Sequence, residues 1–435
     1  MTARAVDVDA LAARAVAAVA ESAILDATRT LASRTSAPDD ERALADDVVT
    51  WGRRAFPELE WEIDAIDARS ANVIARSAFG DAARELAVYG HLDTSLSGDA
   101  ARDRAITGED SGPPPLAVDG RRVRGFGVGV AKAPTASGIV AFSAAASALR
   151  AESVPHRLTL LLAAGGTHRA APSSSRAVAS DRPAFSRGVR HALANGWRPD
   201  AVLNVKGGPP GVLREEPGAA YLRVTVRRMW SAALARRSVA PDGGLVRHAG
   251  AVIDAIEEWR ESYLAANAPR GQLAPEIAIG AIASGSSEKP DLLPGVLELF
   301  IYAVLLPGTD PDAVAADIAR ALTTRVAALP GAPRVAVDVY AAAPGGATAA
   351  GADIVRIAER AWSKHTSRSQ DVRDWTGATD GAIFLERGIP TARMGVSVTR
   401  DERDPRIESV SLDELASAAR AYAETIVRYA AGQPS

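Results

Sequence analysis

The sequence predicts an α/β protein in which a second, smaller β-α-β-β-α-β unit is inserted. Strand-like apolar runs alternate with alanine-rich helical stretches in the first half of the chain, the texture changes near residue 218, and the first texture resumes near residue 344. The chain has 435 residues, more than a single hydrophobic core usually serves, so two structural units are expected.

In the first half, strand-like segments occur at ELAVYG (85–90), LTLLLAA (158–164) and AVLNV (201–205). Alanine-rich stretches such as ASGIVAFSAAASALRA (136–151) lie between them, which predicts a sheet with helices on its faces. Residues 99–122 are rich in Gly, Pro, Asp and Arg and predict a surface loop.

The inserted unit has its own alternation of strands and helices. Four strand-like segments are YLRVTVRRMW (221–230), EIAIGAIAS (276–284), VLELFIYAVLLPG (296–308) and RVAVDVYAA (334–342), with a helical stretch before the second and before the fourth. This order is ferredoxin-like. We predict an α/β catalytic-type domain formed by residues 1–217 and 344–435, and a lid domain at 218–343.

Composition narrows the classes of function. The 50 basic and 53 acidic residues nearly cancel, which speaks against nucleic acid or an anionic membrane as a partner and favours a small-molecule substrate. The absence of cysteine excludes disulfides, thiolate metal sites and a cysteine nucleophile. The first twenty residues predict an amphipathic helix rather than a signal peptide, and no run of about 20 uncharged apolar residues stands out, so a cytoplasmic protein is expected.

Four stretches resemble motifs of the M20 family of metallopeptidases and amidohydrolases, in the family's order. They are YGHLDTSLSG, VRGFGVGVAKAPTASGIVAF, SGSSEKPDLLPGVLELFIYAVLLPG and TGATDGAIFLERGIPTARMGV. The resemblance covers nearly the whole chain. It implies an M20-type α/β domain with an inserted ferredoxin-like lid, a ligand cleft between the two domains, and a homodimer formed through the lid.

The resemblance also implies a two-zinc site, of which the sequence keeps the beginning. His91 stands where the first metal ligand is expected, and Asp93 where a carboxylate orients that histidine. The positions of the other ligands and of the general base hold Val130, Gly166, Thr167, Lys206 and Asp404. Because most anionic ligands are replaced, we predict that the family zinc site is lost and that the chain uses no cofactor. The alternative is a single weak metal on His91, Asp404 and His168.

The remaining polar groups suggest catalytic roles. His91 with Asp93 is the candidate acid–base pair, expected to converge with Lys206 and Asp404. Lys206 would polarise a carbonyl, pair with a substrate carboxylate, or act as a base or amine nucleophile. The competing interpretation is that Lys206 neutralises Asp93 or Asp404 in an inactive site.

Four further residues are weaker candidates. His168 and Thr167, in the loop after LTLLLAA, would add an imidazole and a hydroxyl at the cleft edge, although loop residues of these types are often merely solvated. By the resemblance, Asp291 replaces a substrate-binding asparagine of the lid. Asp380 is placed at the substrate side, with hydrogen bonds behind the cleft.

Three functions stay open at this point. The first is a divergent M20-like enzyme that acts on an amide-like or amino-acid-like small molecule by metal-independent hydrolysis, acyl transfer, cyclisation or a lyase step. The second is an inactive M20 homologue that serves as a ligand-binding or partner subunit. The third is a zinc-dependent amidohydrolase with an atypical site.

Overall fold

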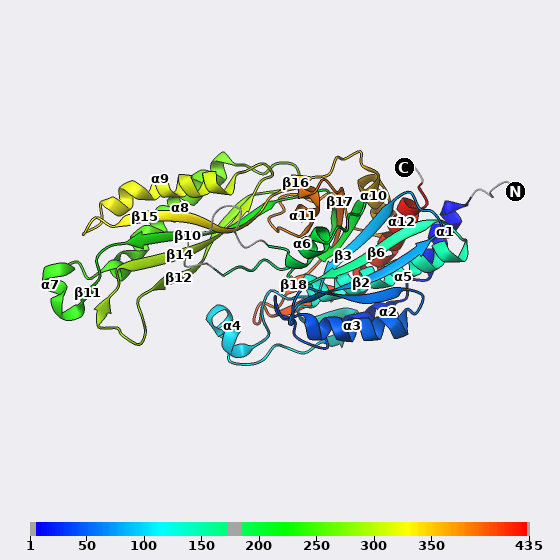
Figure 1. Ribbon diagram of the computed structural model, residues 1–435, viewed down its shortest axis with the longest axis horizontal. Helices are drawn as coiled ribbons and strands as arrows, with labels where there is room; N and C mark the ends of the chain where they lie inside the picture. Colours follow the sequence, from blue (N-terminus) through cyan, green and yellow to red (C-terminus); the bar gives the residue numbers. More distant parts are fainter. Residues whose placement is uncertain (1–5, 172–184, 433–435) are drawn as a thin grey trace.

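The computed structural model describes residues 6–171 and 185–432. Two parts follow one another along the longest axis of the molecule: a seven-stranded sheet with helices on both faces, and a four-stranded sheet covered by two helices (Figure 1). The predicted fold class, an α/β protein with a β-α-β-β-α-β insertion, is confirmed. The domain limits at 217/218 and 343/344 stay a prediction.

The large sheet has the strand order β1-β2-β6-β3-β7-β17-β8. Its central strands β6, β3, β7 and β17 are parallel, and the outer strands are antiparallel. The strands are β1 (Glu60–Ala65), β2 (Ala71–Phe79), β3 (Glu85–His91), β6 (His156–Ala163), β7 (Ala201–Gly207), β8 (Gly211–Leu213) and β17 (Thr391–Val396).

Helices form a layer on each face of this sheet. The larger core includes residues of α1 (Val8–Ala17), α2 (Glu21–Leu31), α3 (Arg42–Ala55), α5 (Ala133–Ala151), α10 (Asp353–His365) and α12 (Leu412–Ala430). A smaller core includes α6 (Arg187–Ala194) and α11 (Gly381–Glu386). A second sheet joins β4 (Ala117–Asp119), β5 (Arg122–Phe126), β18 (Thr399–Arg400) and β19 (Ile407–Ser411). Helix α4 (Ala100–Thr107) and the π-helical turn η1 (Val128–Lys132) complete this part.

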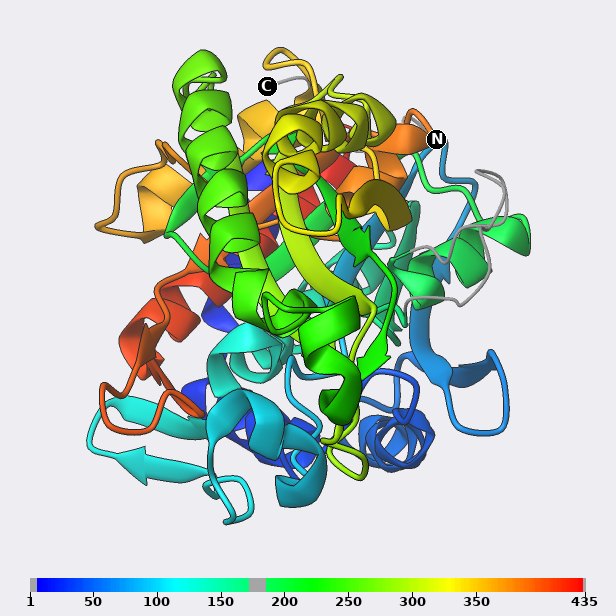
Figure 2. The same ribbon diagram turned by 90° about the vertical axis from the view of Figure 1, so that its left-hand side faces the viewer.

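The four-stranded sheet has the order β12-β14-β10-β15. Its strands are β10 (Gly218–Arg227), β12 (Glu276–Ser284), β14 (Val296–Leu305) and β15 (Arg334–Ala343). Helices α8 (Ala249–Ala266) and α9 (Pro311–Ala327) lie side by side against it (Figure 2). β12 forms one edge of this sheet, and the homodimer expected through this region stays a prediction.

Short elements join or extend the two parts. They are the pairs β9 (Glu215–Glu216) with β16 (Gly346–Ala347) and β11 (Ser231–Ala232) with β13 (Leu292–Leu293), helix α7 (Arg236–Val239), and the 3₁₀ turns η3 (Ala233–Ala235) and η4 (Leu245–His248).

The two-residue period of the central strands determines which side chains face the insertion. Val88 and Leu203 point into the larger core, whereas Tyr89 and Val202 point into the smaller core, which also receives residues of β10 and β15. Tyr89 lies opposite Asn204 in the β3/β7 register. Two residues further along each strand, His91 at the end of β3 and Lys206, one residue before the end of β7, therefore lie level with each other on the face of the smaller core.

Helix α5 packs close to the large sheet because two glycines at their contact lack side chains. A Cβ at Gly90 of β3 would lie 2.8 Å from Oγ1 of Thr135, and a Cβ at Gly138 would lie 2.6 Å from Cγ2 of Val205. The stretch Val128–Ala151 is also long and apolar enough to cross a membrane by length and composition, but 94% of its most apolar window is buried inside the protein. It is therefore a core helix of this fold, and the cytoplasmic location stays a prediction.

Lys132 fastens the start of α5 to the segment after α2. Its Nζ donates to the carbonyl oxygens of Leu31 (2.5 Å) and Arg34 (3.0 Å) and to Oγ of Ser36 (3.1 Å), and the side chain is buried. We expect Lys132→Met to lower the free energy of unfolding by about 2 to 4 kcal/mol, because it leaves buried acceptors without donors. Urea denaturation measures the change.

Lys289→Met is the matched control, since Lys289 forms an exposed ion pair with Asp291. It should change the free energy of unfolding by less than about 0.5 kcal/mol. Equal effects of the two substitutions would contradict the anchoring role of Lys132.

Candidate active site

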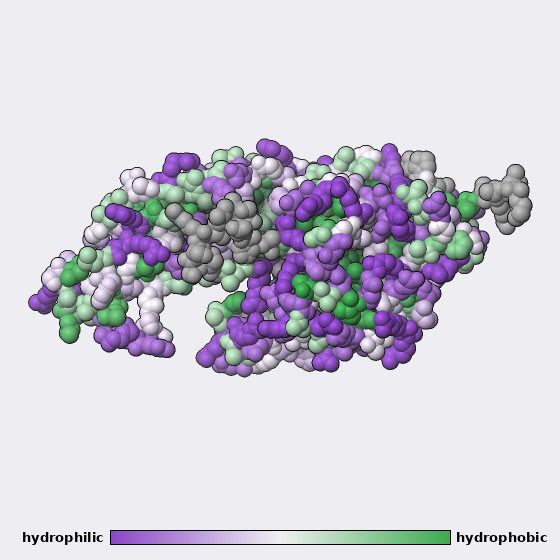
Figure 3. Space-filling model, in the orientation of Figure 1, coloured by the Kyte–Doolittle hydropathy of each residue, from purple (hydrophilic) through white to green (hydrophobic). Residues whose placement is uncertain are grey.

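A cavity of about 660 Å³ opens where the carboxyl ends of the central strands meet the four-stranded sheet. The outline of the molecule is hollowed between that sheet and helix α4 (Figure 3). The residues that line the cavity with side chains of chemical interest are Ser95, Val130, Thr167, His168, Lys206, Tyr221, Tyr302, Trp375, Thr379, Ser397 and Arg400. Among the described lining residues there is no Asp or Glu.

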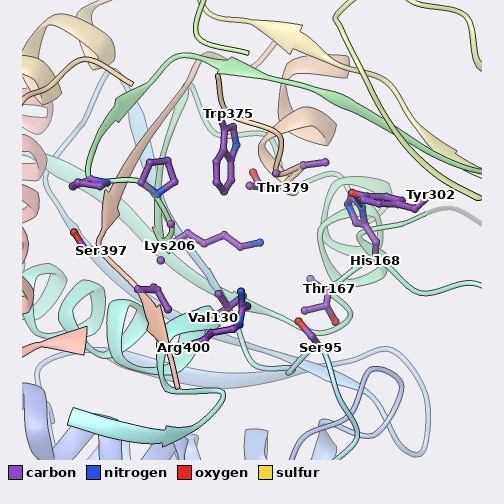
Figure 4. A pocket seen from close by; sticks show the side chains of 18 of the residues that line it. Ser95, Val130, Thr167, His168, Lys206, Tyr302, Trp375, Thr379, Ser397 and Arg400 are labelled. Atoms are coloured by element: carbon purple, nitrogen blue, oxygen red, sulfur yellow. Dashed lines mark hydrogen bonds between the residues drawn. The ribbon is translucent and has the colours of Figure 1, made fainter. Parts of the chain in front are cut away.

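Lys206 occupies the middle of this cavity. Its side chain extends from the end of β7 toward the wall that carries His168 and Tyr302 (Figure 4). The residue is 7% exposed, and within the described chain its amine has neither a hydrogen bond nor an ion pair. Burial lowers the pKa of Lys206, as does the nearby charge of Arg393, while the charges of Asp380, Glu216 and Asp93 act in the opposite direction.

Asp93 joins His91 to the loop that follows β6. Its carboxylate lies 3.2 Å from Nδ1 of His91 and accepts the backbone N–H groups of Gly166 (2.7 Å) and Thr167 (2.7 Å), together with the Thr167 hydroxyl. Burial alone would raise the pKa of Asp93, but the charge of His91 and the hydrogen bonds from His91 and Thr167 outweigh it and hold the pKa below its usual value. The predicted His91–Asp93 pair is thus formed.

His91 itself lies one layer below the cavity surface. It is 1% exposed and does not line the cavity, and its Nε2 is buried with no partner in the described residues. Gly166 covers it: a Cβ at this glycine would lie 2.4 Å from Cβ of His91. Thr167, in contrast, reaches the cavity.

The loop that carries Thr167 and His168 is held from both parts of the molecule. Buried Glu41 accepts the backbone N–H of Gly165 (2.9 Å), and Tyr221 of β10 donates to the carbonyl oxygen of His168 (2.7 Å). The ring of His168 stacks on Phe185 with centroids 4.1 Å apart. Burial and the charge of Lys206 lower the pKa of His168 to about 3, so its imidazole is neutral at pH 7.

Asp380 lies behind the cavity, next to the lining residue Thr379. It is fully buried and accepts hydrogen bonds from the hydroxyls of Tyr89 and Ser186. Burial raises its pKa, and the charge of Lys206 acts in the opposite direction. Asp380 therefore acts on Lys206 through its negative charge from behind the cavity and is not part of the cavity surface.

The structure does not bring Asp404 or Asp291 to the cavity. Asp404 lies in the turn between β18 and β19, where Nε of Arg406 binds it at 2.8 Å, so the expected convergence with His91 and Lys206 does not occur. Asp291 is exposed beside β13 and forms an ion pair with Lys289 at 2.9 Å. In both cases a neighbour in sequence satisfies the carboxylate locally.

Two residues that line or support the cavity were not expected there. Trp375 forms one cavity wall, and the guanidinium of Arg393 lies 4.8 Å from its ring centroid. Arg393 is fully buried; its Nη2 donates to the carbonyl of Gly207 (2.8 Å), and its Nε and Nη1 have no partner in the described residues. The sequence signal that could have pointed to Arg393 is the presence of an arginine inside the otherwise apolar strand TARMGV.

The donors present do not fit the two-metal centre that the resemblance implies. No group of three or more His, Asp or Glu side chains placed to hold one ion occurs in residues 6–171 and 185–432. The carboxylate of Asp93 is occupied by His91 and by the loop after β6, and the amine of Lys206 stands in the middle of the cavity. We derive no catalytic step through a metal.

Comparisons with known proteins establish the fold. No protein-family model and no curated protein matches the sequence. Among solved structures, aminopeptidase PepT from Bacillus cereus matches with a TM-score of 0.63 at 18% identity, covering 94% of this chain and 98% of that one. The YXEP protein of Bacillus subtilis, a dinuclear metal binding peptidase from the M20 family, matches with a TM-score of 0.59 at 14% identity, covering 95% and 99%.

A hydantoinase/carbamoylase family amidase from Burkholderia ambifaria matches with a TM-score of 0.58 at 16% identity, covering 96% of this chain and 98% of that one. The resemblance to M20 proteins is therefore confirmed at the level of the fold. The expectation of no cofactor is corrected: it is contradicted by this likeness, because solved structures of the fold include a dinuclear metal binding peptidase.

Glu41 gives the site a pH-dependent contribution to stability. Burial, helped by the nearby charge of Asp93, raises the pKa of Glu41 from 4.5 to about 7. The folded protein therefore keeps a proton that the unfolded chain releases, so stability falls as the pH rises from 4.5 to 7, by about 3 kcal/mol. We expect Glu41→Gln to remove this slope, as measured by urea denaturation at several pH values across the window.

Glu62→Gln is the control, because the Glu62 side chain is half exposed, and it should keep the wild-type slope. If Glu41→Gln and the wild type lose stability equally over this range, Glu41 is not the titrating group.

Proposed function

We propose that this chain is a hydrolase-type enzyme that acts on an amide-like or amino-acid-like small molecule in the cavity between the two sheets. The observation that carries the proposal is the amine of Lys206, which has no partner among the described residues and lies in the middle of a 660 Å³ cavity at the strand ends. The shared fold with peptidases and an amidase supports the reaction class as an analogy.

Lys206 is the group best placed to act on a scissile carbonyl. As an ammonium it would donate to the carbonyl oxygen and stabilise the negative charge that develops there. As a free amine it would accept a proton from the attacking nucleophile. The burial that lowers its pKa makes the second form accessible nearer neutral pH.

The other site residues support this amine. Thr167 presents a hydroxyl at the cavity surface, and Asp93 fixes that hydroxyl and the backbone beside it. His91, beneath Gly166, orients the Asp93 carboxylate and favours its ionised form, and it does not touch the substrate. We assign the His91–Asp93 pair a positioning role in the proposed reaction.

We also propose that the family's ligand positions are substituted in this chain. Val130, Thr167 and Lys206 line one cavity, as expected of positions that once shared a ligand. The proposal concerns the residues at these positions and rests on the resemblance for their former role.

An inactive, ligand-binding homologue is the second candidate. It is favoured by one observation: the described cavity lining has no carboxylate to serve as a general base of the usual kind. Both candidates keep the cavity as the binding site, so turnover separates them.

Lys206→Met tests the proposed function. We expect it to reduce kcat/KM for the best substrate in a panel of dipeptides, N-acyl amino acids and N-carbamoyl amino acids by about 100-fold or more, the usual cost of a lost transition-state donor. Product release is measured by mass spectrometry.

Asp291→Ala is the control for this experiment and should keep wild-type kinetics, because Asp291 lies outside the cavity lining. Turnover that survives in Lys206→Met would refute the assigned role. A panel without any turnover would favour the ligand-binding candidate.

A gain of metal affinity tests the substituted positions. We expect the double variant Val130→Asp, Lys206→Glu to bind Zn²⁺ at least about tenfold more tightly than the wild type, because two carboxylates then face one cavity. Isothermal titration calorimetry measures the affinity. Val246→Asp, an exposed substitution outside the cavity lining, is the control, and an unchanged affinity in the double variant would contradict the proposed origin of the site.

A further inference from the structure

Lys206 is unusual for its residue type as well as for its place. Only four of the 50 basic residues are lysines: Lys132, Lys206, Lys289 and Lys364. Lys289 and Lys364 form ion pairs with at least half of each side chain exposed, and buried Lys132 uses its amine for three hydrogen bonds. Lys206 is the buried lysine whose amine has no partner within the described chain. A chain that otherwise favours arginine thus places a primary amine in the middle of this cavity.

Burial in a cavity whose described lining holds no carboxylate favours the neutral, nucleophilic form of this amine, whereas the charges of Asp380, Glu216 and Asp93 behind the lining favour the ammonium. The described cavity lining contributes a second cation, Arg400, and no carboxylate, and Arg393 lies behind the wall formed by Trp375. A lysine that is desolvated and close to other cations is the usual form of an amine nucleophile, whereas an arginine cannot perform this chemistry. Burial and Arg393 both lower the pKa of Lys206, in agreement with this geometry.

The walls of the cavity indicate which chemical features a carbonyl compound would need in order to bind there. Trp375, Tyr221 and Tyr302 offer flat apolar surface, with the rings of the two tyrosines 5.5 Å apart. Arg400 is a half-exposed cation on the lining that can bind a carboxylate, although Glu408 accepts one of its N–H groups at 3.1 Å. Burial raises the pKa of Tyr302 above its usual value, so its hydroxyl remains a proton donor.

We propose that Lys206 forms an imine with the carbonyl carbon of a 2-oxo acid that carries a planar apolar side chain. The Nζ lone pair forms the C–N bond, the carbonyl oxygen takes up protons and leaves as water, and the nitrogen loses two protons. A hydroxyl of the cavity, such as that of Tyr302, accepts the protons that the nitrogen loses and donates protons to the departing oxygen. The step therefore needs no oxidant or reductant. This activity is separate from the proposed amide hydrolysis and does not depend on it.

Reductive trapping on the full chain tests the proposal. The protein is incubated with phenylpyruvate and sodium cyanoborohydride, which converts an imine into a stable secondary amine, and the four lysines are mapped by peptide mass spectrometry. We expect Lys206 to be modified at least tenfold more than exposed Lys289 and Lys364. Modification of Lys206 at or below the level of these two lysines overturns the proposal.

Two further probes test the carbonyl class and the site. Acetophenone has the ring and the carbonyl without the carboxylate, and it should label Lys206 at least tenfold less; equal labelling overturns the 2-oxo acid assignment. Phenyllactate has no carbonyl and should protect Lys206 by occupying the cavity; a lack of protection overturns the cavity as the site of reaction.

Lys206→Arg keeps the positive charge and removes the amine. Total incorporation of phenylpyruvate into this variant should fall to that of the exposed lysines, while its thermal unfolding reports whether the fold is intact. The mapping of the wild-type chain stands by itself if the variant does not fold. If phenylpyruvate is trapped on Lys206 but no amide is turned over, the imine is supported and the proposed hydrolysis is refuted. If amides are turned over but no imine is trapped, only the imine is refuted.

Discussion

The buried carboxylate of Asp93 is the contact on which the candidate site depends. Its two oxygens bind one imidazole nitrogen, two backbone N–H groups and a hydroxyl, drawn from the ends of β3 and β6. Such a carboxylate, buried and saturated, fixes the geometry of everything attached to it, because breaking any contact leaves a charge without compensation. The loop with Thr167 and His168 is therefore held against the sheet, and the cavity keeps its shape around Lys206.

The overall fold could be predicted because its signals are local. The runs ELAVYG, LTLLLAA and AVLNV became β3, β6 and β7, and the β-α-β-β-α-β order was readable from alternation alone. Helix α4 was missed within a stretch assigned to a loop. Its two end signals were present in the sequence: Asp99, whose side chain accepts from the N–H of Arg102, and Gly108, which adopts a positive φ of 73°.

The site could be predicted in part, for a different reason. His91 and Asp93 are two residues apart, so their pairing follows from the strand end, and Lys206 lies near the end of the neighbouring strand β7. Arg393 with Trp375 and Tyr221 with His168 join residues 18 and 53 positions apart, and no pattern in the sequence announces such contacts. The expected convergence of Asp404 with Lys206 does not occur, because Arg406, two residues away, already binds the Asp404 carboxylate.

Gly166 carries a consequence for how this cleft can change over evolutionary time. A side chain at this position would collide with the His91 ring and with the Tyr89 hydroxyl, both of which belong to the rigid end of β3. A carboxylate at position 166 would therefore need a compensating change in the residues beneath it. A single substitution at Gly166 is expected to destabilise the fold, so the cleft can accommodate changes at the lining residues around Lys206 more readily than at position 166.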